Sequence, residues 1–142
     1  MSHFSRAELI RSQVAQERAI DNQPPLVVLA AIDRTLASLE RVRAILGHPM
    51  QILSGYRSPK LNAAVGGSRT SQHMSGQAVD FVCPGFGPPV KIFEALVPLR
   101  RSLGLDQIIL ERTWIHVSFT DSPRYMVLKQ DEDGVVRQIK LA

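Results

Sequence analysis

The sequence predicts an α+β fold, in which N-terminal helices pack on a mostly antiparallel sheet. Apolar residues recur at helical spacing in the first third of the chain, whereas the second half contains short alternating segments that are typical of strands. Helices followed by a run of strands favour α+β over an alternating α/β architecture. The 142 residues fit a single domain, with a helical part at about 1–47 and a sheet part at about 48–142.

Two helices are expected before the sheet. Ser5 and Glu8 have the spacing of a capping box, which predicts a first helix from about Ser5 to Ala19. The run 22–25, Asn-Gln-Pro-Pro, breaks that helix, and its last proline suits the first turn of the next one. The second helix should end at Gly47. Its apolar stripe is too short for a coiled coil and should therefore face the core; it comprises Leu29, Ile32, Leu36, Leu39, Val42 and Leu46.

The remaining elements are short. Helices are expected at 59–65 and 89–103, the latter kinked at Pro98. Asp131 to Gly134 has the composition of a hairpin turn. The predicted strands lie at 49–53, 77–82, 107–111, 114–119, 125–130 and 135–141.

Composition excludes several classes of protein. The chain has a formal charge of +4 and a pI of about 9.7, which favours anionic partners such as nucleic acid, anionic lipid or bacterial cell wall, or simply indicates a basic soluble protein. No Lys/Arg block or recognition motif supports nucleic-acid binding. No apolar run is long enough for membrane insertion, and the N-terminus lacks the apolar stretch of a signal peptide, so cytoplasmic synthesis is expected. Cys83 is the only cysteine, which excludes an intramolecular disulfide and cysteine-rich zinc sites.

Two of the four histidines lie in chemically suggestive contexts. His73 follows a loop-like segment, and Gly76 permits a turn that folds His73 back over the next strand. Alternation in that strand places Asp80 among apolar neighbours, where a carboxylate needs a partner or a metal. In the strand 114–119, alternation places Trp114, His116 and Ser118 on one face, away from the core. Taken alone, a strand histidine is more often a hydrogen-bonded structural residue.

The pattern Ser71-x-His73-x-x-Gly76-x-Ala78-x-Asp80, followed by Trp114-Ile115-His116, resembles the zinc D-alanyl-D-alanine carboxypeptidase family, peptidase M15. Ser54-Gly55-Tyr56-Arg57-Ser58-Pro59, with Asn62 and Gly66-Gly67, fits the same family. The N-terminal pattern through 22–25 looks like its phage and prophage subgroup, so the resemblance covers nearly the whole chain.

The resemblance implies that His73, Asp80 and His116 hold one Zn²⁺ ion. Arg57 would steady the developing oxyanion or the substrate carbonyl, and Ser71 would hydrogen-bond the substrate backbone. Arg57 could instead be a surface or capping cation. Tyr56 and Trp114 could line the substrate groove, or either could belong to the core.

A general base must take a proton from the attacking water. Several relatives place a Glu or His three residues before the last histidine, but here that residue is Thr113, which cannot serve. Glu111 is the nearest acid and matches the spacing of the phage-type subgroup, so we expect it to be the base. A solvated strand-end carboxylate is the alternative for Glu111, and Asp106 is the fallback candidate for the base.

The sequence therefore predicts a zinc-dependent peptidase that hydrolyses bonds in the peptidoglycan stem peptide, as a D-Ala-D-Ala carboxypeptidase or as an L-Ala-D-Glu endopeptidase of endolysin type. The alternative is a catalytically silent, zinc-bearing domain that binds the cell wall or belongs to a virion. The enzyme is expected to be a monomer that acts at the bacterial wall after release through a phage holin. A nucleic-acid binder is a distant third reading.

Overall fold

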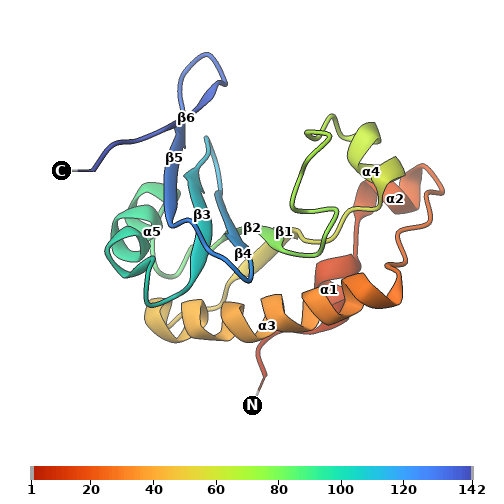
Figure 1. The fold of residues 1–142 in the computed structure, drawn as a ribbon, viewed down its shortest axis with the longest axis horizontal. Coiled ribbons are helices and arrows are strands. Elements are labelled where there is room, and N and C mark those ends of the chain that lie inside the picture. Colours follow the sequence, from red (N-terminus) through yellow and green to blue (C-terminus); the bar gives the residue numbers. More distant parts are fainter. Residues whose placement is uncertain (1, 142) are drawn as a thin grey trace.

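The computed structural model describes residues 2–141 and has an α+β architecture, as the sequence predicts (Figure 1). Its helices surround one end and one face of a single sheet. The long helix α3 runs beneath that sheet, and α5 flanks it on the side away from the N-terminal helices (Figure 1). The helices are α1 (Arg6–Ile10), α2 (Gln13–Glu17), α3 (Leu26–Leu46), α4 (Pro59–Ala64) and α5 (Pro89–Leu96), with a 3₁₀ turn at Val97–Leu99.

The sheet has six strands in the order β1-β2-β4-β3-β5-β6. Every neighbouring pair is antiparallel except β3 and β5, which are parallel, so the prediction of a mostly antiparallel sheet is confirmed. The predicted turn at residues 131–134 joins β5 to β6 as an antiparallel pair. The strands are β1 (Gln51–Ser54), β2 (Ala78–Val82), β3 (Leu105–Leu110), β4 (Ile115–Phe119), β5 (Met126–Gln130) and β6 (Val136–Gln138).

The prediction of one N-terminal helix reaching Ala19 is wrong. The capping box at Ser5 and Glu8 is present, but α1 ends at Ile10, and the next residue, Arg11, is extended with ψ of 133°. The side chain of Ser12 then accepts a hydrogen bond from the backbone N–H of Ala15 over 3.2 Å and starts a second short helix. A second N-cap residue, Ser12, therefore divides the predicted helix into two short helices.

The ends of α3 and α5 are explained by a glycine and a proline. Gly47 ends α3 in a left-handed conformation with φ of 66°. The predicted helix 89–103 does not continue with a kink but ends at Leu96, and Pro98 lies in the 3₁₀ turn that follows. Pro98 has no backbone N–H to donate, so the α-helical ladder stops before it.

The hydrophobic core lies between α3, α5 and one face of the sheet. Ile32 and Leu39 of α3 and Phe81 of β2 are completely buried in it, each a burial worth about 1.5–3 kcal/mol. Cys83 is also fully buried, with its Sγ 3.6 Å from the carbonyl oxygen of His48. No helix within residues 2–141 is long and apolar enough to cross a membrane. Because strand side chains alternate, the opposite face of the sheet is left for polar residues.

Candidate metal centre

Asp80 and His116 face each other on the polar side of the sheet. They are register partners in the antiparallel pair β2 and β4, and Asp80 Oδ1 lies 2.9 Å from His116 Nδ1. Opposed residues of an antiparallel pair have their side chains on the same face. The alternation expected from the sequence thus brings together two groups separated by 36 positions.

His73 reaches the same place from the loop between α4 and β2. Gly76 adopts φ of 73°, and its carbonyl oxygen accepts a hydrogen bond from Thr35 of α3 over 2.7 Å, which fixes the turn. His73 Nε2 then lies 3.3 Å from Asp80 Oδ2. The predicted turn at Gly76 therefore does fold His73 back over the strand.

The tautomer of His73 is set by a carbonyl group. Its Nδ1 lies 2.7 Å from the backbone oxygen of Gly55, which can only accept a hydrogen bond, so Nδ1 carries the proton. The lone pair of Nε2 is then directed toward Asp80 and His116. This is the arrangement by which metal-binding histidines are oriented in proteins.

The three side chains form a compact donor set. One ligand atom from each of His73, Asp80 and His116 lies within 4.8 Å of the others, and the two imidazole rings meet edge to face with centroids 5.2 Å apart. His73 and Asp80 are buried, and the side chain of His116 is 12% exposed. Within residues 2–141, no other group of three His, Cys, Asp or Glu side chains is placed to hold a metal.

Asp80 is ionised in this cluster. Burial alone would raise the pKa of its carboxyl group, but the contacts with His116 and His73 outweigh burial and hold that pKa well below its ordinary value. The cluster therefore offers one carboxylate and two imidazoles, the type of donor set that zinc takes in catalytic sites with an open position.

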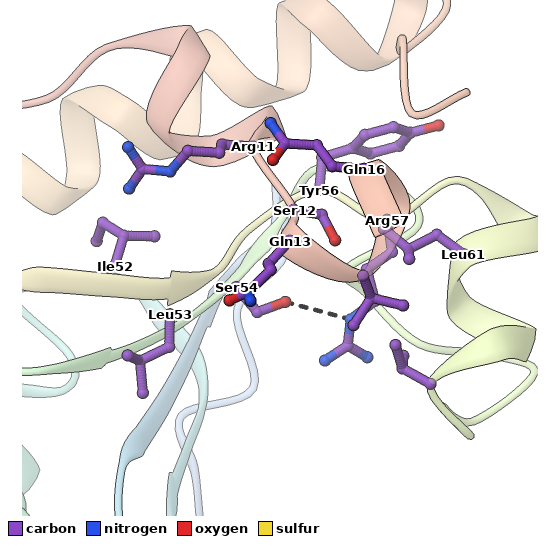
Figure 2. Close-up of a pocket in the computed structure, with 12 residues that line it drawn as sticks. Arg11, Ser12, Gln13, Gln16, Ile52, Leu53, Ser54, Tyr56, Arg57 and Leu61 are labelled. Carbon is purple, nitrogen blue, oxygen red and sulfur yellow. Dashed lines mark hydrogen bonds between the residues drawn. The ribbon is translucent and has the colours of Figure 1, made fainter. Parts of the chain in front are cut away.

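Arg57 is held beside this cluster by several contacts. Its backbone N–H donates to the carbonyl oxygen of His73 over 3.0 Å. Its guanidinium donates to Ser54 Oγ over 3.2 Å and to Asn62 Oδ1 over 3.4 Å, and Nη2 lies 3.6 Å from Asp80 Oδ2. Figure 2 shows the Ser54 contact as a dashed line. Arg57 is thus a half-buried, fixed cation, not a freely solvated one.

Glu111 is returned toward the cluster by a tight turn. The backbone N–H of Glu111 donates to the carbonyl oxygen of Trp114 over 3.1 Å, so the two residues flank the connection between β3 and β4. Burial raises the pKa of the Glu111 carboxyl group, and the negative charge of Asp80 raises it further. The Trp114 indole N–H is buried without a hydrogen bond of good geometry, although it lies near enough to favour the charged form of Glu111.

A cavity of about 590 Å³ is lined by most of the residues singled out from the sequence. The three cluster residues line it together with Arg57, Ser71, Glu111 and Trp114. The structure brings these seven side chains to one place. Their roles as zinc ligands, base and substrate contacts stay predictions.

Two other candidates lie elsewhere. Tyr56 does not line this cavity: it is 4% exposed, belongs to the core, and borders a neighbouring cavity of about 650 Å³ (Figure 2). It follows β1 directly before Arg57, and adjacent side chains of an extended segment point to opposite sides. Asp106, the fallback base, accepts hydrogen bonds from Arg124 and Gln72, so its carboxylate is already occupied.

Several supporting residues had no role assigned from the sequence. Gly55 supplies the carbonyl group for His73, and Asn62 supports Arg57. A Cβ at Gly67 would lie 2.0 Å from Asn62 Oδ1 and 3.0 Å from Arg57 Nη1, so a larger residue there would displace these side chains. Asn62 and Gly67 were part of the resemblance, which was the one sequence signal for them. Arg124 also lines the cavity and carried no signal.

Comparison with known proteins agrees with this arrangement. No curated protein matches the chain. The family model described as Peptidase M15 matches residues 2–118, which include the His/Asp/His cluster, Arg57 and Glu111. The match covers most of the chain and all seven side chains of the cavity named above, so the chain belongs to the peptidase M15 family, a family of metallopeptidases.

Proposed function

We propose that the protein is a zinc-dependent peptidase that hydrolyses bonds in the stem peptide of bacterial peptidoglycan. One observation carries the proposal: a buried donor set of two imidazoles and a carboxylate shares one cavity with a carboxyl group, Glu111, and a fixed cation, Arg57. Family membership supports the reaction class.

The donor set suits zinc rather than a harder cation. His73 Nε2, Asp80 and His116 would hold the ion, and Mg²⁺ or Ca²⁺ would instead call for several oxygen ligands. Zinc bound by such ligands acts as a Lewis acid and lowers the pKa of water. The proton that Gly55 holds on His73 Nδ1 keeps the other ring nitrogen free for this role.

Glu111 would serve as the general base and then the acid. It borders the cavity at the end of β3, where a raised pKa makes its carboxylate a stronger base than a solvated glutamate. It would take a proton from the attacking water and pass that proton to the leaving amine. Arg57, whose guanidinium is fixed by Ser54 and Asn62, would stabilise the negative charge that develops on the carbonyl oxygen.

The substrate is proposed from charge as well as family. The chain is basic, with a net charge of +4, which favours association with an anionic wall. Both a D-Ala-D-Ala carboxypeptidase and an L-Ala-D-Glu endopeptidase are compatible with one open cavity. We propose synthesis in the cytoplasm and action at the wall after release through a phage holin.

Digestion of purified muropeptides, followed by mass spectrometry, tests the proposal. Wild-type protein should cut the stem, and Glu111→Gln should lower the rate by about 10²–10⁴-fold while zinc content stays the same. Glu132→Gln, at an exposed turn residue, is the matched control and should leave the rate unchanged. Loss of one D-Ala identifies a carboxypeptidase, whereas a divided stem identifies an endopeptidase.

Two results would contradict the proposal. Equal rates for wild type and Glu111→Gln would remove Glu111 from the chemistry. No cleavage by protein that holds one zinc ion would favour a silent domain that binds the wall or belongs to a virion.

A further inference from the structure

We propose that Arg124 is a substrate-binding residue that anchors a carboxylate of the peptide at the end of the cavity away from Glu111. The inference rests on the proposed function for the identity of the peptide. The anchor itself is argued from the contacts of Arg124 and from its place in the cavity.

Arg124 is held by one edge and free at the other. Its Nε donates to Asp106 Oδ1 over 2.9 Å and its Nη2 to Asp106 Oδ2 over 2.6 Å. These bonds use one edge of the planar guanidinium and leave the edge formed by Nη1 and Nη2 for a second bidentate partner. The side chain is 55% exposed and borders the cavity, so that second edge can meet a ligand.

Asp106 is fixed in a position from which it holds Arg124. It lies at an irregularity of β3, where the register shifts between Leu105 and Gln107, and such bulges redirect a side chain. Its side chain is buried and also accepts hydrogen bonds from Gln72 Nε2 over 2.9 Å and from the backbone N–H of Arg124 over 3.0 Å. These contacts, led by the Arg124 side chain, lower the pKa of Asp106 to about 2, so the carboxylate stays charged.

The backbone beside Arg124 is strained. Tyr125 adopts φ of 58°, a left-handed conformation that is unfavourable for a residue with a side chain. Its backbone N–H donates to Leu105 over 3.1 Å, and Arg101 lies 4.7 Å above its ring. A bulge, a buried carboxylate and a strained neighbour thus converge on the placement of one arginine.

Arg124 and Arg57 lie on opposite sides of the metal-binding cluster. Arg57 follows the edge strand β1, Arg124 precedes β5, and the cluster residues of β2 and β4 lie between them in the sheet. Asp106 lies near the start of β3 and Glu111 directly follows its end, so most of the length of the strand separates the two residues. A group bound by Arg124 is therefore remote from the base and belongs to a residue that flanks the cut bond.

A carboxylate is the group that fits. Guanidinium and carboxylate form two parallel hydrogen bonds, and stem peptides carry free carboxylates outside the bond that is cut. Charge-assisted hydrogen bonds contribute about 1.5–3 kcal/mol, which corresponds to a roughly 10–100-fold preference for a carboxylate over its amide.

Binding measurements separate this role from catalysis. Zinc-loaded protein carrying Glu111→Gln is titrated with a stem peptide that has free carboxylates and with the same peptide in which they are amidated. The free acid should bind about 10-fold or more tightly than the amide. Adding Arg124→Gln should abolish that preference, Arg124→Lys should restore part of it, and Arg137→Gln, which changes an exposed arginine of β6 outside this cavity, should keep it.

Each outcome bears on one claim. Persistence of the preference in Arg124→Gln, in protein whose thermal unfolding stays cooperative, overturns the anchor and leaves the peptidase intact. If Arg124→Gln does not fold, the partial preference expected of Arg124→Lys decides, and full preference in that variant overturns the anchor. Absence of binding and of cleavage for both peptides overturns the proposed substrate and the anchor together.

Discussion

The Nδ1–H of His73 donates a hydrogen bond to the carbonyl oxygen of Gly55 over 2.7 Å. The segment that contains Gly55 follows β1, and its neighbour Tyr56 is tied to the first helix by a hydrogen bond from its N–H to the carbonyl oxygen of Leu9. The orientation of a predicted metal ligand thus depends on contact between the N-terminal helix and the sheet.

Gly55→Ala should weaken zinc binding. A Cβ at this position would lie 2.4 Å from the carbonyl oxygen and 2.7 Å from Cα of Leu9, so the backbone must shift and displace the acceptor of His73. Loss of such a supporting contact lowers metal affinity by about 10–100-fold. Calorimetric titration measures it, with Gly85→Ala as control, since a Cβ there meets only the exposed side chain of His48. Equal affinities for wild type and Gly55→Ala would contradict the role of this contact.

Gly67→Ala should affect the rate but not the metal. A Cβ at Gly67 would collide with Asn62 Oδ1 and press on Arg57 Nη1, which moves the guanidinium without touching the cluster. A displacement of about 1 Å in a positioning group can lower the rate about 10²-fold. Steady-state kinetics and zinc content are measured together on the same protein. Loss of zinc in step with loss of rate would show that Arg57 and the metal ligands cannot be separated.

Chelation should lower the melting temperature, and Asp80→Asn should remove that response. Zinc at about 100 times its dissociation constant stabilises the folded state by about 2.7 kcal/mol. For a protein of this size the gain corresponds to a shift of roughly 5–10 °C. Differential scanning calorimetry with and without zinc measures the shift. The same shift in Asp80→Asn would place the bound metal elsewhere.

Asp106→Asn should reduce the loss of folding stability that accompanies a fall in pH below about 4. The pKa of Asp106 falls from 3.8 to about 2 on folding, because the side chain of Arg124 and other donors favour its charged form. The stabilisation is therefore complete above about pH 4 and lost as the pH falls toward 2, by on the order of 2 kcal/mol.

Urea unfolding of wild type and Asp106→Asn between pH 2 and pH 5 measures this difference. Asp33→Asn is the matched control, because Asp33 also pairs with an arginine, Arg6, at 2.7 Å but on the exposed surface. Water and salt screen that pair, so its removal should alter the pH dependence far less. An equal effect of the two substitutions would show that burial of Asp106 is not what makes its ion pair stabilising.

The class of fold could be predicted because it depends on local patterns. Capping at Ser5, the apolar stripe of α3 and the alternation in β2 and β4 each specify an element within a few residues. Pairing is a different matter, since alternation shows that a segment is a strand but not which strand lies beside it. The parallel pairing of β5 with β3 therefore had no signal in the sequence.

The same distinction between local patterns and strand pairing applies to the candidate site. His73 and Asp80 fall in one short motif and His116 on a recognisable strand, but their convergence was implied by the family resemblance, because alternation does not show that β2 and β4 are neighbours. Arg124 could not be found in this way, because its position depends on the bulge at Asp106 and the left-handed Tyr125, neither of which has a sequence pattern. For Tyr56 the sequence left the substrate groove and the core as alternatives, and its side chain lies on the core side of the extended segment.

The most direct test of the account is reconstitution of metal-stripped protein with zinc, monitored by the cleavage of muropeptides. The account predicts that activity is absent without metal, rises linearly with added zinc and reaches its maximum at one equivalent. The protein with His116→Ala should remain inactive at the same zinc concentration, because one of the three donors is missing. Full activity of stripped protein in chelator, or an unaltered zinc response in His116→Ala, would contradict a catalytic metal at His73, Asp80 and His116.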